Sequence, residues 1–292
     1  MIDSGVILAG GTGSRLFPVT KVTNKHFLNV YDKPMIYYSL SILLLLKIKK
    51  VTIVVDENSL NEAKNLLGDG TEFGIKIIYT IQKSPLGLPD AIMKTLKTDD
   101  TDKKFAVVLG DNFLYGREFY NNFYNLIDIS KCNIFYQKVK NPEDFAVIEV
   151  NEGENKFNLV EKPKQYLSDL AVTGIYTFDN NFFKFFHEIK VSNRNEYEIT
   201  DILNSYNKLD SLNPVYLGRG MTWLDMGSFD SLLYCANFVK TIQERQNILV
   251  NSPHEIAYRN GWITKKHVHA LYKKNLNSMY FKNLYDSINS KY

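Results

Sequence analysis

Short runs rich in β-branched and aromatic residues alternate with segments of helical periodicity in the first part of the chain. We expect strands at residues 6–9, 51–55, 75–82 and 106–109, and helices at 34–46 and 60–67. Parallel strands need a connection that returns the chain to the same edge of the sheet, and a helix usually provides it. The alternation therefore predicts a Rossmann-like α/β fold, with a mainly parallel sheet and helices on both faces.

The pattern changes near residue 132, where strand candidates follow one another without helices between them. They lie at residues 134–139, 146–150, 157–161 and 172–178, and turn-forming segments such as Asn-Pro-Glu-Asp separate them. Closely spaced strands joined by turns commonly pair antiparallel. We therefore expect a mixed, partly antiparallel extension of the same sheet.

The next part of the chain is predicted to be mainly helical. We expect helices at residues 198–209 and 228–248, with a short strand at 215–217 between them. Ser228 and Asp230 suit the first turn of the second helix, because side-chain oxygens there accept hydrogen bonds from free backbone N–H groups.

Beyond residue 251 the pattern stays helical, with Pro253, Gly261 and Asn275 as interruptions. No internal repeat or low-complexity linker divides the chain. We therefore expect one α/β domain over residues 1–250 and a helical C-terminal segment over residues 251–292.

Composition and charge are those of an ordinary globular protein. Of 292 residues, 45% are hydrophobic, which is enough for a large core. The formal net charge of +3 comes from lysines spread along the chain rather than from a basic block. The sequence therefore indicates no nucleic-acid partner.

No segment predicts contact with a membrane. The longest apolar run, residues 42–46, is far shorter than the roughly 20 residues that span a bilayer. The N-terminus lacks the basic and apolar regions of a secretory signal, so we expect a cytoplasmic protein. Cys132 and Cys235 lack metal-site spacing and are expected to be core residues.

A glycine-rich loop is the sharpest chemical signal. Residues 8–16 read Leu-Ala-Gly-Gly-Thr-Gly-Ser-Arg-Leu directly after a predicted strand, and glycines let backbone N–H groups approach phosphates closely. The loop is not a Walker motif, because no Gly-Lys-Ser/Thr follows it. It is not a dinucleotide fingerprint either, because Leu16 occupies the third glycine position. Asp32 lies near the position of the ribose-binding acid in that fingerprint, but without the glycine the match is accidental. A plain strand-to-loop turn is the alternative for the loop alone.

Two cations and two carboxylates complete the candidate chemistry. Arg15 and Lys25 lie in one connection and could offset charge on phosphates. Asp111 follows the predicted strand 106–109, at the edge where open parallel sheets bind ligands, and Asp225 follows another apolar segment. Such a pair suits Mg²⁺, which prefers few protein oxygens together with phosphates and water. Taken singly, solvated cations and capping carboxylates are the alternatives.

These residues together resemble the sugar nucleotidyltransferases, and within them the thymidylyltransferase branch. The resemblance covers nearly the whole chain and rests on the following motifs: GGTGSR at residues 10–15, Lys25, YDKPMIYY at 31–38, LGDG at 67–70, VLGDN at 108–112, EKPK at 161–164, VTG at 172–174, EITD at 198–201 and WLD at 223–225. It implies a nucleotidyltransferase fold, with a nucleotide-binding part over residues 1–130 and a sugar-binding part over residues 131–230.

The resemblance also implies residue roles. Arg15 and Lys25 would hold the triphosphate, Lys162 the attacking sugar phosphate, and Asp111 with Asp225 the Mg²⁺ ion. Nucleotide contacts are expected at Leu8, Ala9, Gly10, Gly11, Thr12, Gly13, Gln82, Pro85, Gly87 and Asp111, with the Gln82 amide pairing with both a donor and an acceptor on the base. Sugar-phosphate contacts are expected at Ala146, Glu161, Lys162, Val172, Gly174 and Tyr176. A surface charge pair is the alternative for Glu161-Lys162, and a core strand for Val172 and Tyr176.

The implied reaction joins dTTP to a hexose 1-phosphate, foremost glucose 1-phosphate, and releases pyrophosphate. The dTDP-sugar would serve deoxysugar or rhamnose-type glycan synthesis. A deoxy- or amino-hexose 1-phosphate, or UTP or CTP as the nucleotide, are alternatives with the same chemistry. A non-catalytic nucleotide-sugar-binding regulatory subunit is an alternative of another class, and a nicotinamide oxidoreductase is disfavoured by the missing glycine.

Two positions depart from the family pattern. His26 replaces the usual glutamine near the nucleotide, and Ala146 replaces a glycine that lets backbone approach the sugar. The resemblance further implies a homotetramer with a second nucleotide site for feedback inhibition between subunits. Tyr115, Gly116, Arg219, Glu255 and Arg259 match that site, and ordinary packing or surface roles are the alternative.

Overall fold

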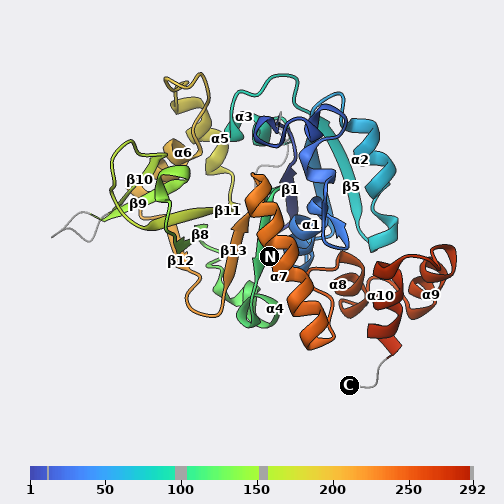
Figure 1. The fold of residues 1–292 in the computed structure, drawn as a ribbon. Coiled ribbons are helices and arrows are strands. Elements are labelled where there is room, and N and C mark those ends of the chain that lie inside the picture. Colours follow the sequence, from blue (N-terminus) through green and yellow to red (C-terminus); the bar gives the residue numbers. More distant parts are fainter. Residues whose placement is uncertain (12, 96–103, 151–156, 290–292) are drawn as a thin grey trace.

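The computed structural model describes residues 1–11, 13–95, 104–150 and 157–289, and within them nine strands form one sheet. Its parallel half consists of β5 (Lys76–Ile81), β4 (Lys50–Val55), β1 (Ser4–Leu8) and β6 (Phe105–Leu109), in that spatial order. These are the four strands expected from the first part of the sequence. Their carboxyl ends therefore meet at one edge, as Figure 1 shows for the strands around β1.

The second half of the sheet is largely antiparallel. Strand β11 (Leu170–Phe178) runs antiparallel to β6 and also pairs with β9 (Ala146–Val150) and β8 (Cys132–Lys138). Strands β9 and β10 (Phe157–Glu161) form an antiparallel ladder, and β12 (Leu212–Tyr216) lies parallel to β8. The predicted mixed extension is confirmed.

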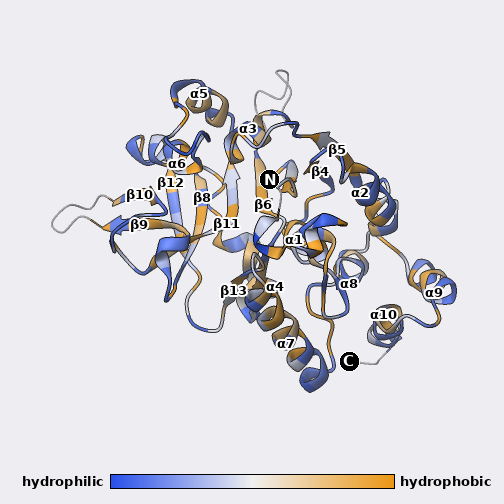
Figure 2. Cartoon of the chain, turned by 45° about the horizontal axis from the view of Figure 1, so that its top comes forward, coloured by the Kyte–Doolittle hydropathy of each residue, from blue (hydrophilic) through white to orange (hydrophobic). Residues whose placement is uncertain are grey.

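Both faces of the sheet are buried. Val6 and Leu8 of β1 pack into one hydrophobic cluster, whereas the alternating Ile7 and Ala9 pack into another. Helices cover both sides: α1 (Met35–Leu45) and α2 (Leu60–Leu67) contribute to the second cluster, and α3 (Leu88–Met93), α5 (Asn181–Glu188) and α6 (Ile199–Lys208) contribute to the first. Figure 2 shows hydrophobic colour on central strands such as β6 and β8.

Several short elements are not apparent in the sequence pattern. They are the two-stranded pairs β2 (Asn29–Val30) with β3 (Lys33–Pro34) and β7 (Asn112–Tyr115) with β13 (Thr222–Asp225), and the helix α4 (Arg117–Asn122). Pairs of two or four residues carry too few alternating positions to show a period of two. The pair β7–β13 nevertheless positions the candidate site.

Four helices complete the described chain: the first matches the helix predicted at 228–248, and the other three form the predicted helical C-terminal region. They are α7 (Phe229–Gln246), α8 (Pro253–Arg259), α9 (Lys265–Lys274) and α10 (Met279–Asn289). Ser228 caps α7 as predicted, because its Oγ accepts a hydrogen bond of 3.2 Å from the backbone N–H of Ser231.

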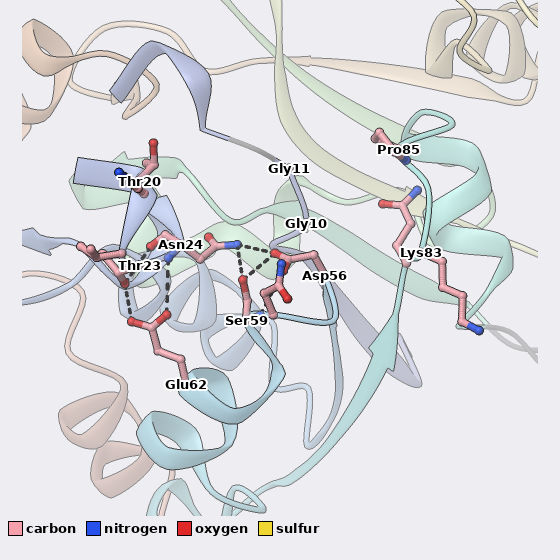
Figure 3. A pocket seen from close by; sticks show the side chains of 14 residues that line it. Gly10, Gly11, Thr20, Thr23, Asn24, Asp56, Ser59, Glu62, Lys83 and Pro85 are labelled. Atoms are coloured by element: carbon pink, nitrogen blue, oxygen red, sulfur yellow. Dashed lines mark hydrogen bonds between the residues drawn. The ribbon is translucent and has the colours of Figure 1, made fainter. Parts of the chain in front are cut away.

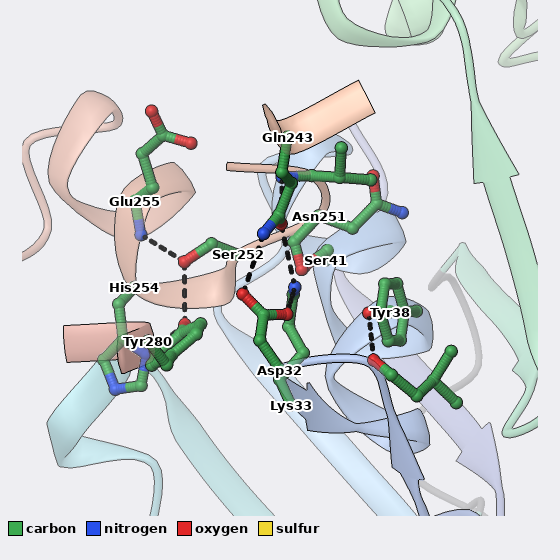
Figure 4. Close-up of polar contacts among 12 residues, drawn as sticks. Asp32, Lys33, Tyr38, Ser41, Gln243, Asn251, Ser252, His254, Glu255 and Tyr280 are labelled. Atoms are coloured by element: carbon green, nitrogen blue, oxygen red, sulfur yellow. Dashed lines mark hydrogen bonds and ion pairs between the residues drawn. The ribbon is translucent and has the colours of Figure 1, made fainter. Parts of the chain in front are cut away.

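A buried ion pair joins α7 to the start of α1. The side chains of Asp32 and Lys33 are each 1% exposed and contact one another. Gln243 of α7 donates to Asp32 Oδ2 at 2.9 Å and accepts from Lys33 Nζ at 3.3 Å (Figure 4). Burial lowers the pKa of Lys33, and the Asp32 carboxylate opposes this. Asp32 therefore contributes to the contact between α7 and the segment before α1, a role that the sequence did not indicate.

A second polar chain fixes the C-terminal helices. His254 Nε2 lies 2.8 Å from Glu72 Oε1, and its Nδ1 lies 2.8 Å from the hydroxyl of Tyr280. That hydroxyl is 2.7 Å from Ser252 Oγ, which caps α8 (Figure 4). These contacts connect α8 and α10 with the 3-10 helix Thr71–Phe73 beside the sheet.

The two cysteines lie in the core, and the described helices were expected to lack a membrane span. Cys132 and Cys235 are buried free thiols, as predicted. Among the helices of the described residues, none is both long and apolar enough to cross a bilayer.

Candidate active site

A cavity of about 450 Å³ opens beside the carboxyl ends of β1, β4 and β5. Gly10 and Gly11 follow β1 and line it, and Gln82 and Pro85 from the connection after β5 line it as well (Figure 3). The structure therefore brings these four predicted nucleotide contacts together. Thr12 lies outside the described residues.

The neighbouring predicted contacts define the path of the glycine-rich loop. Leu8 ends β1, and the N–H of Ala9 donates to Val54 O at 2.8 Å, so the loop leaves the sheet at this point. Gly13 has a φ of 57°, a left-handed conformation that favours glycine, and its carbonyl accepts from Thr20 Oγ1 at 3.0 Å.

Asn24 fixes the far end of this loop, a role that the sequence did not reveal. Its Nδ2 donates to Ala9 O at 3.1 Å and to Asp56 Oδ2 at 3.0 Å, and its Oδ1 accepts from the His26 N–H at 3.0 Å (Figure 3). Glu62 of α2 contacts the Thr23 hydroxyl next to it. The side chain of Asn24 thus connects Ala9 with Asp56 and caps the 3-10 helix Lys25–Phe27.

Lys25 and Asp111 form an ion pair in the partly buried centre of the site. Lys25 Nζ lies 2.6 Å from Asp111 Oδ2. Burial raises the pKa of Asp111, but the Lys25 ammonium and neighbouring donors outweigh this and lower it to about 2. Asp111 is therefore ionised at neutral pH, and the expected phosphate-binding and metal-binding residues are in direct contact.

The ladder of β7 and β13 brings Asp225 to the same place. Asp225 pairs with Asn112, and the N–H of Met226 donates to Asp111 O at 2.8 Å. Burial and the Asp111 charge raise the pKa of Asp225, whereas Arg15 lowers it. A carboxylate that is disfavoured by burial and by a like charge is suited to binding a cation.

Arg15 reaches this pair from the glycine-rich loop. An ideal Cβ built on Gly227 would lie 2.6 Å from Arg15 Nη2 and 3.1 Å from Asp225 Oδ2, so the guanidinium occupies the space above Gly227. Arg15, Lys25, Asp111 and Asp225 consequently converge, as expected from the sequence. Within the described residues, no group of three or more His, Cys, Asp or Glu side chains forms a protein-only metal site.

His26 lies buried behind this centre. Its Nδ1 is 2.7 Å from Asn24 Oδ1, and a Cβ at Gly110 would lie 2.5 Å from its ring carbon Cδ2. Burial and the Lys25 charge lower the pKa of His26 to about 3, so the imidazole is neutral at physiological pH. It adds no charge to the site and packs against the backbone that carries Asp111.

The predicted sugar-phosphate residues lie on β9, β10 and β11. Glu161 is opposite Ala146 in the β9–β10 ladder, and the N–H of Lys162 donates to Phe145 O at 3.1 Å. Burial and Glu198 raise the pKa of Glu161, and Arg194 opposes this. Arg194 Nη1 lies 3.5 Å from Glu161 Oε1, which places a cation that the sequence did not indicate next to these residues.

Gly174 allows β11 to lie close to Asn112 at the start of β7. Its N–H donates to Asn112 Oδ1 at 2.9 Å, and the indole N–H of Trp223 donates to the same oxygen at 2.7 Å. A Cβ at Gly174 would lie 2.6 Å from Asn112 Nδ2 and from the Leu109 side chain. Asn112, which sequence reasoning assigned no role, therefore connects β7, β11 and β13.

Val172 and Tyr176 have the core surroundings that were considered as their alternative role. Each is 4% exposed within a hydrophobic cluster, and the Tyr176 ring stacks on Phe178 with centroids 5.8 Å apart. Ala146 belongs to the same cluster.

The residues that match a second nucleotide site begin at the other end of β7, away from Asn112. Arg259 Nη2 lies 2.8 Å from Glu255 Oε1, and both line a cavity of about 540 Å³ together with Gln246. The Tyr115 hydroxyl lies 3.4 Å from Gln246 Oε1. Gly116 abuts the turn of Gly220 and Met221, next to the exposed Arg219.

Comparison with known proteins identifies the family. The family model described as nucleotidyl transferase matches residues 4–242. The chain belongs to the nucleotidyl transferase family. A glucose-1-phosphate thymidylyltransferase of Neisseria meningitidis is 42% identical over 268 residues, covering 91% of this chain and 93% of the relative. A Mycobacterium tuberculosis protein of the same name is 40% identical, covering 89% and 90%.

Solved structures agree on the fold. A Bacillus anthracis protein described as a glucose-1-phosphate thymidylyltransferase matches with a TM-score of 0.71 and 36% identity, covering 80% of this chain and 94% of that one. UDP-glucose pyrophosphorylase of Acinetobacter baumannii matches with a TM-score of 0.67 at 20% identity, covering 84% and 94%, which shows the fold alone. The expected family, fold and enzyme class are confirmed.

The contact between Gly227 and Arg15 generates a prediction for a single added methyl. In Gly227→Ala the new Cβ meets the flexible end of Arg15, so the guanidinium moves while the backbone stays. We expect turnover, measured as pyrophosphate release, to fall about 10-fold, and the free energy of unfolding to change by less than about 1 kcal/mol.

Arg15→Ala provides the matched control. It should lower turnover by about two to three orders of magnitude, since it removes one charge-stabilising donor. Adding Gly227→Ala to this variant should cause little further loss, because the closest group to the new methyl is gone and only the 3.1 Å contact with Asp225 Oδ2 remains. A full additional 10-fold loss in the double variant would contradict this explanation.

Proposed function

We propose that this chain transfers the dTMP moiety of dTTP to a hexose 1-phosphate, with glucose 1-phosphate as the preferred sugar, and releases pyrophosphate. The product would be a cytoplasmic dTDP-sugar precursor of deoxysugars, including rhamnose-type units of cell-surface polysaccharides. The convergence of Arg15, Lys25, Asp111 and Asp225 beside the glycine-rich loop carries the proposal. The shared name of relatives at about 40% identity supports the choice of substrates.

The mechanism requires positioning and charge neutralisation rather than a protein nucleophile. The phosphate oxygen of the sugar attacks the α-phosphorus of dTTP in line, a bond to that phosphorus forms, and the bond to pyrophosphate breaks. Arg15 and Lys25 stabilise negative charge on the triphosphate. Lys162 binds the attacking phosphate, and Arg194 adds a second cation on the sugar side.

The two carboxylates are suited to Mg²⁺. A nearby cation would stabilise the ionised form of Asp225, since burial and the Asp111 charge raise the pKa of this carboxyl. Asp111 Oδ2 contacts Lys25, while its Oδ1 accepts from Asn112 Nδ2 at 3.2 Å, so both oxygens are oriented by neighbours. When bound by Asp111 and Asp225, Mg²⁺ would supply positive charge to the phosphates.

Two other functions remain to be separated from this one by experiment. UTP in place of dTTP is supported by the fold shared with UDP-glucose pyrophosphorylase, and an apolar pocket discriminates a single methyl by little. A non-catalytic regulatory subunit would not need the charged cluster described above, which disfavours it.

A pyrophosphate-release screen tests the proposed function. We expect the highest kcat/KM for dTTP with glucose 1-phosphate among dTTP, UTP and CTP combined with several sugar 1-phosphates. Chelation of divalent cations should abolish release, and added Mg²⁺ should restore it. Absence of release with every pair would support the regulatory alternative, and a higher kcat/KM with UTP would reassign the nucleotide.

Ala146 generates a prediction about the sugar. Its side chain is 7% exposed, lies opposite Glu161 and packs near Val172, so the methyl occupies space where the family has none. One added carbon in a tight pocket shifts preference by about 10- to 200-fold. We expect Ala146→Gly to change the ratio of kcat/KM between glucose 1-phosphate and a deoxy- or amino-hexose 1-phosphate. Unchanged ratios would show that a small loop shift absorbs the methyl.

We also propose a homotetramer with a second nucleotide site for feedback inhibition. The 540 Å³ cavity beside Glu255 and Arg259, together with Tyr115 and the nearby turn at Arg219, supports this placement. Arg219→Ala should leave turnover unchanged and weaken inhibition by the dTDP-sugar about 10-fold, as loss of a charged hydrogen bond would. Inhibition equal to that of the native protein would place the site elsewhere.

A further inference from the structure

The two ends of the Gln82 side-chain amide have different partners. Its Nε2 donates to Asp90 Oδ2 at 3.1 Å and approaches Gly87 O at 3.4 Å. A carboxylate and a carbonyl accept hydrogen bonds but donate none, so only the NH₂ group of the amide can face them. These contacts therefore determine which way the amide is turned.

The oxygen of the amide consequently faces the glycine-rich loop. An ideal Cβ on Gly10 would lie 3.3 Å from Gln82 Oε1, and both residues line the 450 Å³ cavity. Figure 3 shows Pro85 across this cavity from Gly10 and Gly11. With both amide hydrogens directed at protein acceptors, Gln82 presents an acceptor alone, and the expected simultaneous pairing with a donor and an acceptor does not fit this geometry.

Asp90 is itself held from two sides. It lies in the first turn of α3, and Lys94 at the C-cap of this helix contacts its Oδ2. The preceding loop is fixed because Gly87 bridges to Tyr197, whose carbonyl would lie 2.3 Å from a Cβ at Gly87. The side chain of Asp90 is 14% exposed, so the acceptor that orients Gln82 is rigid and largely sheltered from water.

We propose that Asp90 is a specificity-determining residue that acts through Gln82. By fixing the amide oxygen toward the cavity, it favours bases with an N–H donor at pyrimidine N3, which thymine and uracil carry. Cytosine has a lone pair at N3, and two acceptors facing each other leave both without a hydrogen-bond partner. The inference rests on the proposed function, because it takes this cavity to bind the nucleotide base.

Asp90→Asn tests this with nearly the same shape. Asparagine can donate as well as accept, so only the long 3.4 Å contact with Gly87 O still favours the native orientation, and Gln82 can turn its NH₂ group toward the base. We expect the ratio of kcat/KM for dTTP over dCTP, with glucose 1-phosphate, to fall about 10-fold or more, since discrimination by a hydrogen-bonding site is lost when its partner adapts. The ratio for dTTP over dUTP should stay unchanged, because both bases carry the N3 donor.

Lys94→Ala is the control variant, because it removes the other partner of Asp90 and leaves the carboxylate. Its dTTP/dCTP ratio should stay within about 2-fold of the native value, because the Asp90 carboxylate still accepts from Gln82 Nε2 and the half-buried Lys94 adds little to its position. An unchanged dTTP/dCTP ratio in Asp90→Asn, with a native unfolding midpoint, would overturn the assignment.

Dissociation constants of dTTP and dCTP, measured by calorimetry without a sugar, separate this inference from the proposed reaction. A protein that releases no pyrophosphate but prefers dTTP, and loses that preference in Asp90→Asn, would refute the reaction and support the role of Asp90. Equal binding of both nucleotides to the native protein would refute the role of Asp90, whatever the turnover.

Discussion

The repulsion between Asp111 and Asp225 is the constraint on which the local structure depends. Burial disfavours the ionised form of both carboxylates, and the Asp111 charge further disfavours ionisation of Asp225. Lys25 offsets the charge of Asp111, and Arg15 offsets that of Asp225. His26 is neutral and adds nothing to this balance. The cluster therefore contains two cations and two anions in a partly buried volume, and its geometry is set by the backbone segments that carry them.

Those segments come from distant parts of the chain, so their relative positions depend on tertiary contacts. The ladder of β7 and β13 places Asp225 beside Asp111, and α7 begins directly after β13. The buried pair Asp32–Lys33 binds Gln243 of α7 and so joins this helix to the start of α1. Removing one partner of such a pair leaves an uncompensated charge, which costs about 3–5 kcal/mol. Structural stability and active-site geometry are thus coupled through α7.

The sequence predicted the regular elements well and the connections poorly. Strands such as β1 and β4 are short, continuous apolar runs, and the long helix α7 begins at a capping serine. The charged residues beside them belong to recognisable motifs. The roles of Asn24, Asn112 and Arg194 were not predicted, because each acts through contacts that only the folded chain creates. An isolated asparagine or arginine has no periodicity and no spacing rule. Functional and core positions on β11 could be told apart only from the burial of each side chain, which the strand pattern alone does not reveal.

The choice of nucleotide depends on fewer residues than the fold does. A UDP-glucose pyrophosphorylase shares this fold at only 20% identity, so the fold by itself does not determine which base is bound. In the proposed function this distinction depends on the loops after β1 and β5, where the Gln82 amide oxygen lies next to Gly10 in the lining of the cavity. A side-chain amide can turn by 180° with almost no change in shape, so the neighbour that orients it decides whether it presents a donor or an acceptor. Because that neighbour is the carboxylate of Asp90, substrate selection can change through a residue that does not line the cavity.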